Sequence, residues 1–385
     1  MGQGDEPRPV RHPLSHTVVV GAGPAGLATS AALVRAGRAV TLLERADRVG
    51  AAWAARYDSL HLHTVRWLSG LPGLRIPRAY GRWVARDDLL RYLATYAEVH
   101  GLRPELGVTV TGLEAADGAG WVVRTDAGDR TAGRVVVATG YSHTPRRPDW
   151  PGVETFPGDV RHSADYREPT PYAGKHVLVV GAGNSATEIA LDLLGAGARV
   201  TLSVRTPPNI VRRDTYGIPS QVFGIAMKRA PAPLKDPLAA AMRRISVPDL
   251  SAQGLPATTN PYTQFRETGT VPILDTGIVD AVRSGRVAVV AATVSVAGAR
   301  VHLADGGTVE PDAVIAATGF TTGLEPLVGH LGVLDRRGVP RVHGADDLAI
   351  ARGLHFVGIR AELSGLLREI GLEARAVGRA LASRP

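Results

Sequence analysis

The chain has 385 residues, of which 44% are hydrophobic, and this is enough for more than one buried core. Its formal net charge is +8, but the basic residues are spread along the whole chain and aromatic residues make up only 5%. This pattern argues against nucleic-acid binding. The chain contains no cysteine, which excludes disulfides, thiolate metal sites and cysteine nucleophiles. Neither a metal-ligand cluster nor a Ser-His-Asp spacing is evident, so we expect no metal.

The first sixteen residues, Met1–His16, are polar and contain proline, without the apolar core of a signal peptide. We predict that residues 1–16 form a disordered N-terminus. No apolar run in the sequence approaches membrane-spanning length. We therefore expect a cytoplasmic protein without a membrane partner, and the sequence leaves a homodimer open.

The first predicted unit is a strand, a glycine-rich loop, a helix and a second strand within about thirty residues. The strand is Thr17–Val20, the loop is Gly21–Gly26 with the pattern G-x-G-x-x-G, and the helix is Leu27–Ala36. The second strand is Ala39–Leu43. This order is typical of a Rossmann-type dinucleotide site.

Each glycine of this loop has a distinct physical purpose. Gly21 permits the tight turn, Gly23 lets the backbone approach a pyrophosphate, and Gly26 lets the helix pack on the strand. The N-terminus of the helix supplies amide donors for the phosphates. Glu44 follows the second strand, where a carboxylate can accept hydrogen bonds from ribose hydroxyls. The residues expected to hold this cofactor are Gly21, Gly23, Pro24, Ala25, Gly26 and Glu44.

The same order recurs in mid-chain. It comprises a strand at His176–Val180, a loop at Gly181–Ala186, a helix at Thr187–Leu194 and a strand at Arg199–Val204. Gly181 and Gly183 stand where the first loop has its first two glycines. A second dinucleotide site is therefore predicted.

The two units differ at the position that contacts the ribose. Aligning the two loops places Glu44 opposite Val204, and Arg45 opposite Arg205. A carboxylate would repel a 2′-phosphate, whereas a guanidinium binds one bidentately. The first site should therefore bind a cofactor with a free ribose, FAD, and the second should bind NADPH through Arg205.

Other elements complete an α/β fold. A helix is predicted at Asp87–His100, and the chain ends in a strand at Leu354–Val357 and a helix at about Ser364–Ser383. The strand Arg134–Val137 leads into Thr139-Gly140, and a near-copy, Ala313–Ala316, leads into Thr318-Gly319.

We predict two Rossmann-type dinucleotide-binding domains, with the NADPH domain inserted into the FAD domain. The FAD domain would comprise residues 17–150 and 311–385, and the NADPH domain residues 151–310. Residues 206–270 are rich in proline and basic residues, and we interpret them as an insertion that covers an active site.

A longer motif precedes the second loop. Phe156, Gly158, His162 and Tyr166 fit the pattern F-x-G-x-x-x-H-x-x-x-Y at every fixed position. Here the chain resembles the flavin-containing monooxygenases, class B flavoprotein monooxygenases that this pattern identifies. The resemblance is closest to the plant auxin-forming branch and covers most of the chain. In the animal-type enzymes, Asn-Thr stands where His63-Thr64 align.

This resemblance implies an FAD- and NADPH-dependent monooxygenase. It would transfer one oxygen atom from O2, through a C4a-peroxyflavin, to a small organic substrate. That substrate would be a nitrogen or sulfur nucleophile, or an α-keto acid that loses carbon dioxide. Trp53 and His63 would lie near the flavin as catalytic residues. The cofactor contacts that the resemblance implies are Arg45, Thr139, Gly140, Asn184, Ser185, Arg205, Thr318 and Gly319.

Three alternatives can be compared with this interpretation. A Baeyer–Villiger monooxygenase would have tryptophan in place of Tyr166. A pyridine-nucleotide disulfide reductase needs a redox cysteine pair, which the chain does not have. An NADPH oxidase or a non-catalytic flavoprotein redox sensor stays open on the sequence.

Overall fold

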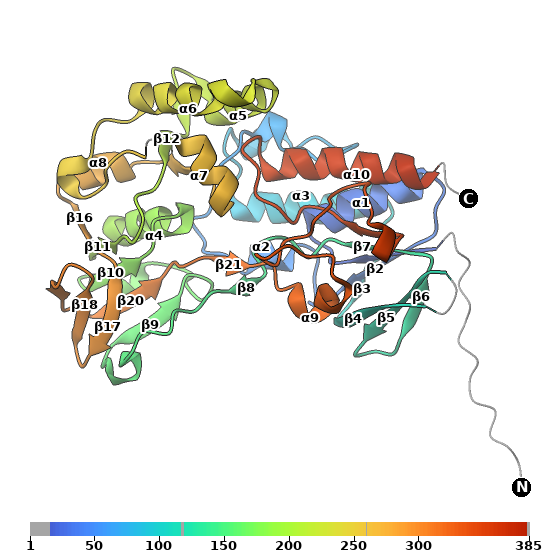
Figure 1. The fold of residues 1–385 in the computed structure, drawn as a ribbon, viewed down its shortest axis with the longest axis horizontal. Coiled ribbons are helices and arrows are strands. Elements are labelled where there is room, and N and C mark those ends of the chain that lie inside the picture. The colour runs from blue at the N-terminus through green and yellow to red at the C-terminus, as the bar shows by residue number, and fades with distance from the viewer. Residues whose placement is uncertain (1–15, 117–118, 259, 383–385) are drawn as a thin grey trace, which may run out of the picture.

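Two parallel five-stranded sheets form the framework of the molecule (Figure 1). They are seen in a computed structural model that describes residues 16–116, 119–258 and 260–382. The predicted disorder of Met1–Ser15 lies outside these residues. His16 contradicts the prediction, because it is buried and its Nε2 lies 3.0 Å from Thr41 Oγ1. This hydrogen bond joins the start of the first strand to its neighbour.

The first sheet has the order β22-β7-β1-β2-β3, with every pair parallel. Its strands are β1 (Thr17–Val20), β2 (Val40–Glu44), β3 (Glu105–Leu106), β7 (Arg134–Val137) and β22 (Leu354–Phe356). One face packs on helices α1 (Pro24–Arg35), α3 (Arg86–Val99) and α10 (Leu366–Ala382). The other face packs on a three-stranded antiparallel sheet of β4 (Val110–Ala115), β5 (Trp121–Thr125) and β6 (Arg130–Ala132).

Successive residues of β1 explain this layering. Val19 belongs to the core under the helices, whereas Val18 and Val20 belong to the core under the small sheet. Alternate side chains of a strand point to opposite faces, so a strand covered on both faces is apolar throughout. The short helices of this unit are α2 (Ala51–Ala54) and α9 (Glu325–Val328).

The second sheet repeats the design with the order β16-β11-β10-β20-β9. Its strands are β9 (Asp159–His162), β10 (His176–Val180), β11 (Arg199–Ser203), β16 (Val287–Val290) and β20 (Ala313–Ala316). Helices α4 (Asn184–Gly195) and α8 (Ile278–Arg283) pack on one face. Strands β17 (Thr293–Ala297), β18 (Arg300–Leu303) and β19 (Thr308–Val309) form a small sheet beside the other face.

One predicted boundary differs from the structure. Strand β20 pairs with β10 and β9, so a division at residue 311 cuts into the second sheet. The chain returns to the first unit afterwards, through β21 (Phe320–Thr321), which is antiparallel to β8 (Thr144–Pro145). The two similar strand-Ala-Thr-Gly segments thus belong to different sheets, which their sequences could not reveal.

The insertion lies above the junction of the two units in Figure 1. It contains β12 (Ile210–Arg212), β13 (Asp214–Thr215), β14 (Ile218–Pro219), α5 (Ser220–Arg229), α6 (Ala232–Ser246) and α7 (Pro261–Thr268), and β12 pairs in parallel with β15 (Ile273–Asp275), which follows the insertion. Gln221 joins it to the first unit, since its Oε1 accepts from Val65 N (3.0 Å) and its Nε2 donates to Ser364 O (2.9 Å). Within the described ranges, no helix is long and apolar enough to cross a membrane.

Helices α1 and α4 begin at Pro24 and Asn184, before the predicted Leu27 and Thr187. The second half of each glycine loop already forms the first helical turn. In α1 the first helical residue is Pro24, and proline suits the first position of a helix because its fixed φ is helical and its missing N–H is not needed there. The amide ends of both helices therefore lie directly beside the loops.

Candidate active site

A large cavity of about 1400 Å³ is lined by residues of both units and of the insertion. Its walls include Gly23 and Asn184 from the two glycine loops, Phe320 from β21 and Met227 from α5. Pockets for one small ligand usually measure about 300–1,000 Å³. The cavity therefore has room for more than one ligand.

The first glycine loop has the geometry of a phosphate cradle. Gly21 has φ +102°, and a Cβ there would lie 2.9 Å from Ala138 O. A Cβ on Gly26 would lie 1.7 Å from Gly21 O. At Gly23, however, a Cβ would meet nothing within 4 Å. The protein itself thus requires glycine at two positions, and at the third it leaves open space beside the N-terminus of α1, as a bound pyrophosphate needs.

Glu44 is fixed beside this cradle. Its Oε2 accepts from Ala22 N (2.7 Å) and its Oε1 from Ala46 N (3.0 Å). A carboxylate has about four acceptor positions, so two remain for ribose hydroxyls. Glu44 and Arg45 both line the cavity. The residues present therefore fit FAD.

The second loop repeats the cradle. Gly181 has φ +132°, and a Cβ there would lie 2.4 Å from Ala317 O. A Cβ on Gly183 would meet nothing within 4 Å. Helix α4 begins at the next residue, and no side chain in the described part of the chain caps it. The second loop therefore fits another pyrophosphate.

The structure supports the comparison of Glu44 with Val204. In both units the first glycine donates its N–H to the carbonyl of the residue just before the compared position, at 2.7 Å and 2.9 Å. Arg205 follows Val204, is exposed, and forms no ion pair with the described residues. The second site thus has a free guanidinium where the first has a fixed acid, which fits NADPH.

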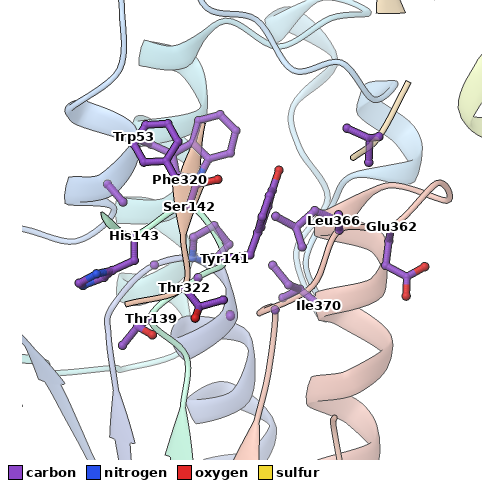
Figure 2. A pocket seen from close by; sticks show the side chains of 18 of the residues that line it. Trp53, Thr139, Tyr141, Ser142, His143, Phe320, Thr322, Glu362, Leu366 and Ile370 are labelled. Atoms are coloured by element: carbon purple, nitrogen blue, oxygen red, sulfur yellow. The ribbon is translucent and has the colours of Figure 1, made fainter. Parts of the chain in front are cut away.

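Aromatic and aliphatic side chains face each other across the cavity. Figure 2 shows Trp53 and Phe320 on one side of the pocket, and Leu366 and Ile370 on the other. The Phe320 ring is held edge-on against the imidazole of His162, with ring centroids 5.2 Å apart. This part of the cavity suits a flat or apolar group.

A mostly buried carboxylate joins the two units behind the cavity wall. Glu188, on α4, accepts hydrogen bonds from Tyr57 Oη (2.5 Å) and His63 Nε2 (2.6 Å). Burial alone would raise the pKa of Glu188, but the charge of His63 and the hydrogen bonds from His63 and Tyr57 outweigh burial and lower it. An ionised Glu188 can only accept, so His63 carries a proton on Nε2. Tyr57 and His63 both line the cavity.

Helix α4 presents polar side chains at every fourth residue, Asn184, Glu188 and Asp192. The Asn184 carboxamide bonds to backbone groups of segment 272–274, at 3.1 Å and 2.9 Å. Asp192 accepts from Tyr166 Oη at 2.8 Å. Residues four apart share one helix face, so this face connects α4 to three different segments. The Asn184 side chain thus holds the segment that follows the insertion, while its backbone amide at the loop stays available to a phosphate.

The four fixed residues of the extended motif do not line the cavity, and its histidine instead supports the start of β21, the crossing strand through which the chain returns to the first unit. His162 Nδ1 accepts from Ala164 N (3.0 Å), and its Nε2 donates to Gly319 O (3.1 Å). Burial lowers the pKa of His162, in keeping with this neutral form. A Cβ on Gly158 would lie 2.2 Å from Asp312 O, so β9 and β20 approach closely there.

The predicted site residues fall into two groups. Those that line the cavity are Gly21, Gly23, Pro24, Ala25, Glu44, Arg45, Trp53, His63, Thr139, Gly140, Asn184 and Ser185. Those of the described chain that do not are Gly26, Phe156, Gly158, His162, Tyr166, Gly181, Gly183, Arg205, Thr318 and Gly319. Sequence reasoning did not single out Glu188 or Arg56. The helical spacing from Asn184 could have indicated Glu188.

The fold and the two cradles define a flavoprotein with two dinucleotide sites. Residues 18–218 match the pyridine nucleotide-disulphide oxidoreductase family. This match covers more than half of the chain, and the absence of cysteine means that the framework is present without a redox disulfide.

The comparisons with individual proteins narrow this class. The chain is 36% identical to the indole-3-pyruvate monooxygenase YUCCA1 of Oryza sativa subsp. japonica, over 89% of this chain and 86% of that protein. It is 32% identical to the probable indole-3-pyruvate monooxygenase YUCCA4 of Arabidopsis thaliana, over 95% and 90%. The flavin-containing monooxygenase from Stenotrophomonas maltophilia superposes with a TM-score of 0.72 at 25% identity, over 95% of this chain and 97% of that one.

The chain belongs to the YUCCA-type flavin monooxygenases, and it is an oxidoreductase that uses FAD and NADPH. The resemblance to flavin-containing monooxygenases and the predicted α/β fold with two dinucleotide domains are thereby confirmed. Cyclohexanone monooxygenase, a structure 20% identical with a TM-score of 0.70, shares the fold.

Proposed function

We propose that the enzyme oxidises an aromatic α-keto acid of the indole-3-pyruvate type to the acid one carbon shorter. One keto acid, one O2, one NADPH and one proton would give the shorter acid, carbon dioxide, water and NADP⁺. The observation that carries this proposal is the aromatic cavity shared by both nucleotide loops, in a chain that resembles two plant indole-3-pyruvate monooxygenases along most of its length.

The two glycine loops divide the cofactors between them. Gly23, the N-terminus of α1 and Glu44 would hold the pyrophosphate and ribose of FAD. Gly183, the N-terminus of α4 and Arg205 would hold the pyrophosphate and 2′-phosphate of NADPH. When bound, these cofactors supply the reducing equivalents and the oxygen activation, and the protein supplies position and exclusion of water.

The wall residues would orient the substrate and hold a proton beside it. Trp53 offers a flat apolar surface on the cavity wall. His63 Nε2–H is committed to Glu188, which leaves Nδ1 without a hydrogen bond to the described residues. An imidazole fixed in this way can take up or release a proton at Nδ1 while keeping its orientation. Glu188 acts through His63 and is a positioning residue.

Coupled turnover tests this proposal. The FAD-loaded protein would be mixed with NADPH in three separate reactions, one with indole-3-pyruvate, one with an amine and one with a thioether. We expect NADPH oxidation to accelerate with the keto acid and to yield indole-3-acetate in equal amount. Oxygenation of the thioether or amine alone would favour the nitrogen or sulfur alternative.

The cytoplasmic location and the homodimer stay predictions.

A further inference from the structure

Arg56 places a positive charge on the aromatic side of the cavity. It lines the cavity, and its Nη2 donates to Ser142 O at 3.2 Å. Its guanidinium carbon lies 4.3 Å from the centroid of the Phe320 ring. Ser142 and Phe320 appear with Trp53 in Figure 2, so the contacts of Arg56 place it at the wall that these aromatic rings form.

This guanidinium has no counter-ion in the described part of the chain. No carboxylate there lies within ion-pair distance of Arg56, and Asp58, two residues further on, pairs with Arg86 at 2.5 Å. Arg167 adds another positive charge nearby, and its Nη1 donates to the carbonyl oxygen of Arg56 at 3.0 Å. Burial lowers the pKa of Arg56. A partly desolvated cation without a partner favours an anion that enters the cavity.

The cofactor phosphates have other places to bind. Both glycine loops offer open space beside a helix N-terminus, at Gly23 on the cavity wall and at Gly183, which does not line the cavity. Arg56 instead lies on the aromatic wall, where its cation–π contact with Phe320 helps to hold the guanidinium in place. A planar guanidinium matches a carboxylate bidentately.

We propose that Arg56 binds the carboxylate of the substrate, while the aromatic part of the substrate packs between Trp53 and the aliphatic wall. This inference rests on the proposed α-keto acid function and makes the substrate class an aromatic carboxylate. The pairing needs no protonation change, because arginine stays charged at all relevant pH values.

A titration without turnover tests this. The oxidised FAD-loaded enzyme would be titrated with benzoate, and with benzamide as the uncharged probe of similar shape, while flavin absorbance is followed. In Arg56→Gln we expect the benzoate Kd to rise roughly 10- to 100-fold and the benzamide Kd to stay constant. Arg56→Lys keeps the positive charge but cannot form the bidentate hydrogen bonds of a guanidinium, so its benzoate Kd should lie between those of the wild type and Arg56→Gln. In the control Arg337→Gln, which removes a cavity arginine already paired with Asp335 (3.4 Å), benzoate binding should not change.

Several outcomes would overturn the assignment. Benzoate could bind the wild type no more tightly than benzamide does, or bind Arg56→Gln as tightly as it binds the wild type. A loss of NADP⁺ affinity in Arg56→Gln with benzoate binding intact would assign the arginine to a cofactor phosphate instead. If Arg56→Gln fails to retain FAD, the Arg56→Lys titration decides alone, and an Arg56→Lys variant that binds benzoate as tightly as the wild type would overturn the assignment. If benzoate binding depends on Arg56 but indole-3-pyruvate is not turned over, the proposed function fails and the carboxylate site stands.

Discussion

Glu188→Gln would separate the two contributions of this mostly buried carboxylate, to stability and to catalysis. The carboxylate accepts two hydrogen bonds, from Tyr57 at 2.5 Å and from His63 at 2.6 Å. A glutamine keeps the shape but has one acceptor oxygen, so one of the two donors loses its partner. Hydrogen bonds to charged groups contribute about 1.5–3 kcal/mol. We expect the free energy of unfolding to fall by about that amount.

The pH dependence of this stability difference follows from the pKa. The pKa of Glu188 lies below its ordinary value of 4.5 in the folded protein. A lowered carboxyl pKa adds stability that is fully present above the unfolded value and is lost as pH falls through the folded value. The melting-temperature difference between wild type and Glu188→Gln should therefore be full at neutral pH and shrink in acid below about 4.5.

Steady-state kinetics give the second readout. Without the carboxylate, His63 is no longer obliged to keep its proton on Nε2. A positioned acid–base group contributes roughly 10²–10⁴-fold, and its misorientation should lower kcat at least about tenfold and change the pH profile, with KM for NADPH unchanged. The control is Asp192→Asn, which removes a carboxylate from the same helix that also accepts from a tyrosine. It should lose similar stability and keep wild-type kcat.

The reasoning would be refuted if Glu188→Gln behaved like Asp192→Asn. Lower stability combined with wild-type kcat and an unchanged pH profile would make Glu188 a structural group alone. Flavin content, measured in both variants, shows that the kinetic comparison is made on loaded enzyme.

Two further predictions concern the cofactor sites. Gly23→Ala should fold but lose FAD affinity, and Gly183→Ala should fold, keep FAD and lose NADPH affinity. Both variants should fold because neither added Cβ meets protein atoms within 4 Å. By contrast, Gly26→Ala should misfold, because its Cβ would lie 1.7 Å from the carbonyl oxygen of Gly21. Circular dichroism and flavin extraction check this, and unchanged FAD binding in Gly23→Ala would contradict it. Arg205→Ala should raise KM for NADPH by roughly 10- to 100-fold, from one charge-assisted contact of about 1.5–3 kcal/mol, and leave NADH almost unaffected. Equal effects on both nucleotides would refute the 2′-phosphate assignment.

Local patterns predicted the two nucleotide units well. Strand-loop-helix order depends on neighbours in sequence, so β1, β10 and the loops at Gly21 and Gly181 lie where the pattern places them. The sequence also showed that the second unit has Val204 where the first has Glu44, because the two units could be aligned with each other. Trp53 and His63 were placed by family resemblance, and both line the cavity.

Contacts between distant segments could not be predicted in this way. Glu188 and His63 are 125 residues apart, and only the packing of the two units brings them together. The same holds for Arg56 and Phe320, whose contact depends on where the crossing strand returns to the first unit. Membership of β20 in the second sheet is likewise a matter of tertiary pairing, which local sequence does not encode.

Oxygen labelling tests the central claim most directly. The FAD-loaded enzyme would be given NADPH, indole-3-pyruvate and ¹⁸O2 in the presence of catalase, which removes any free hydrogen peroxide. The account predicts indole-3-acetate with one ¹⁸O in its carboxylate, in equal amount to NADPH oxidised, and unlabelled carbon dioxide from the original carboxylate. Product formation that catalase abolishes, with NADPH oxidation continuing, would instead show an NADPH oxidase whose peroxide decarboxylates the keto acid in solution.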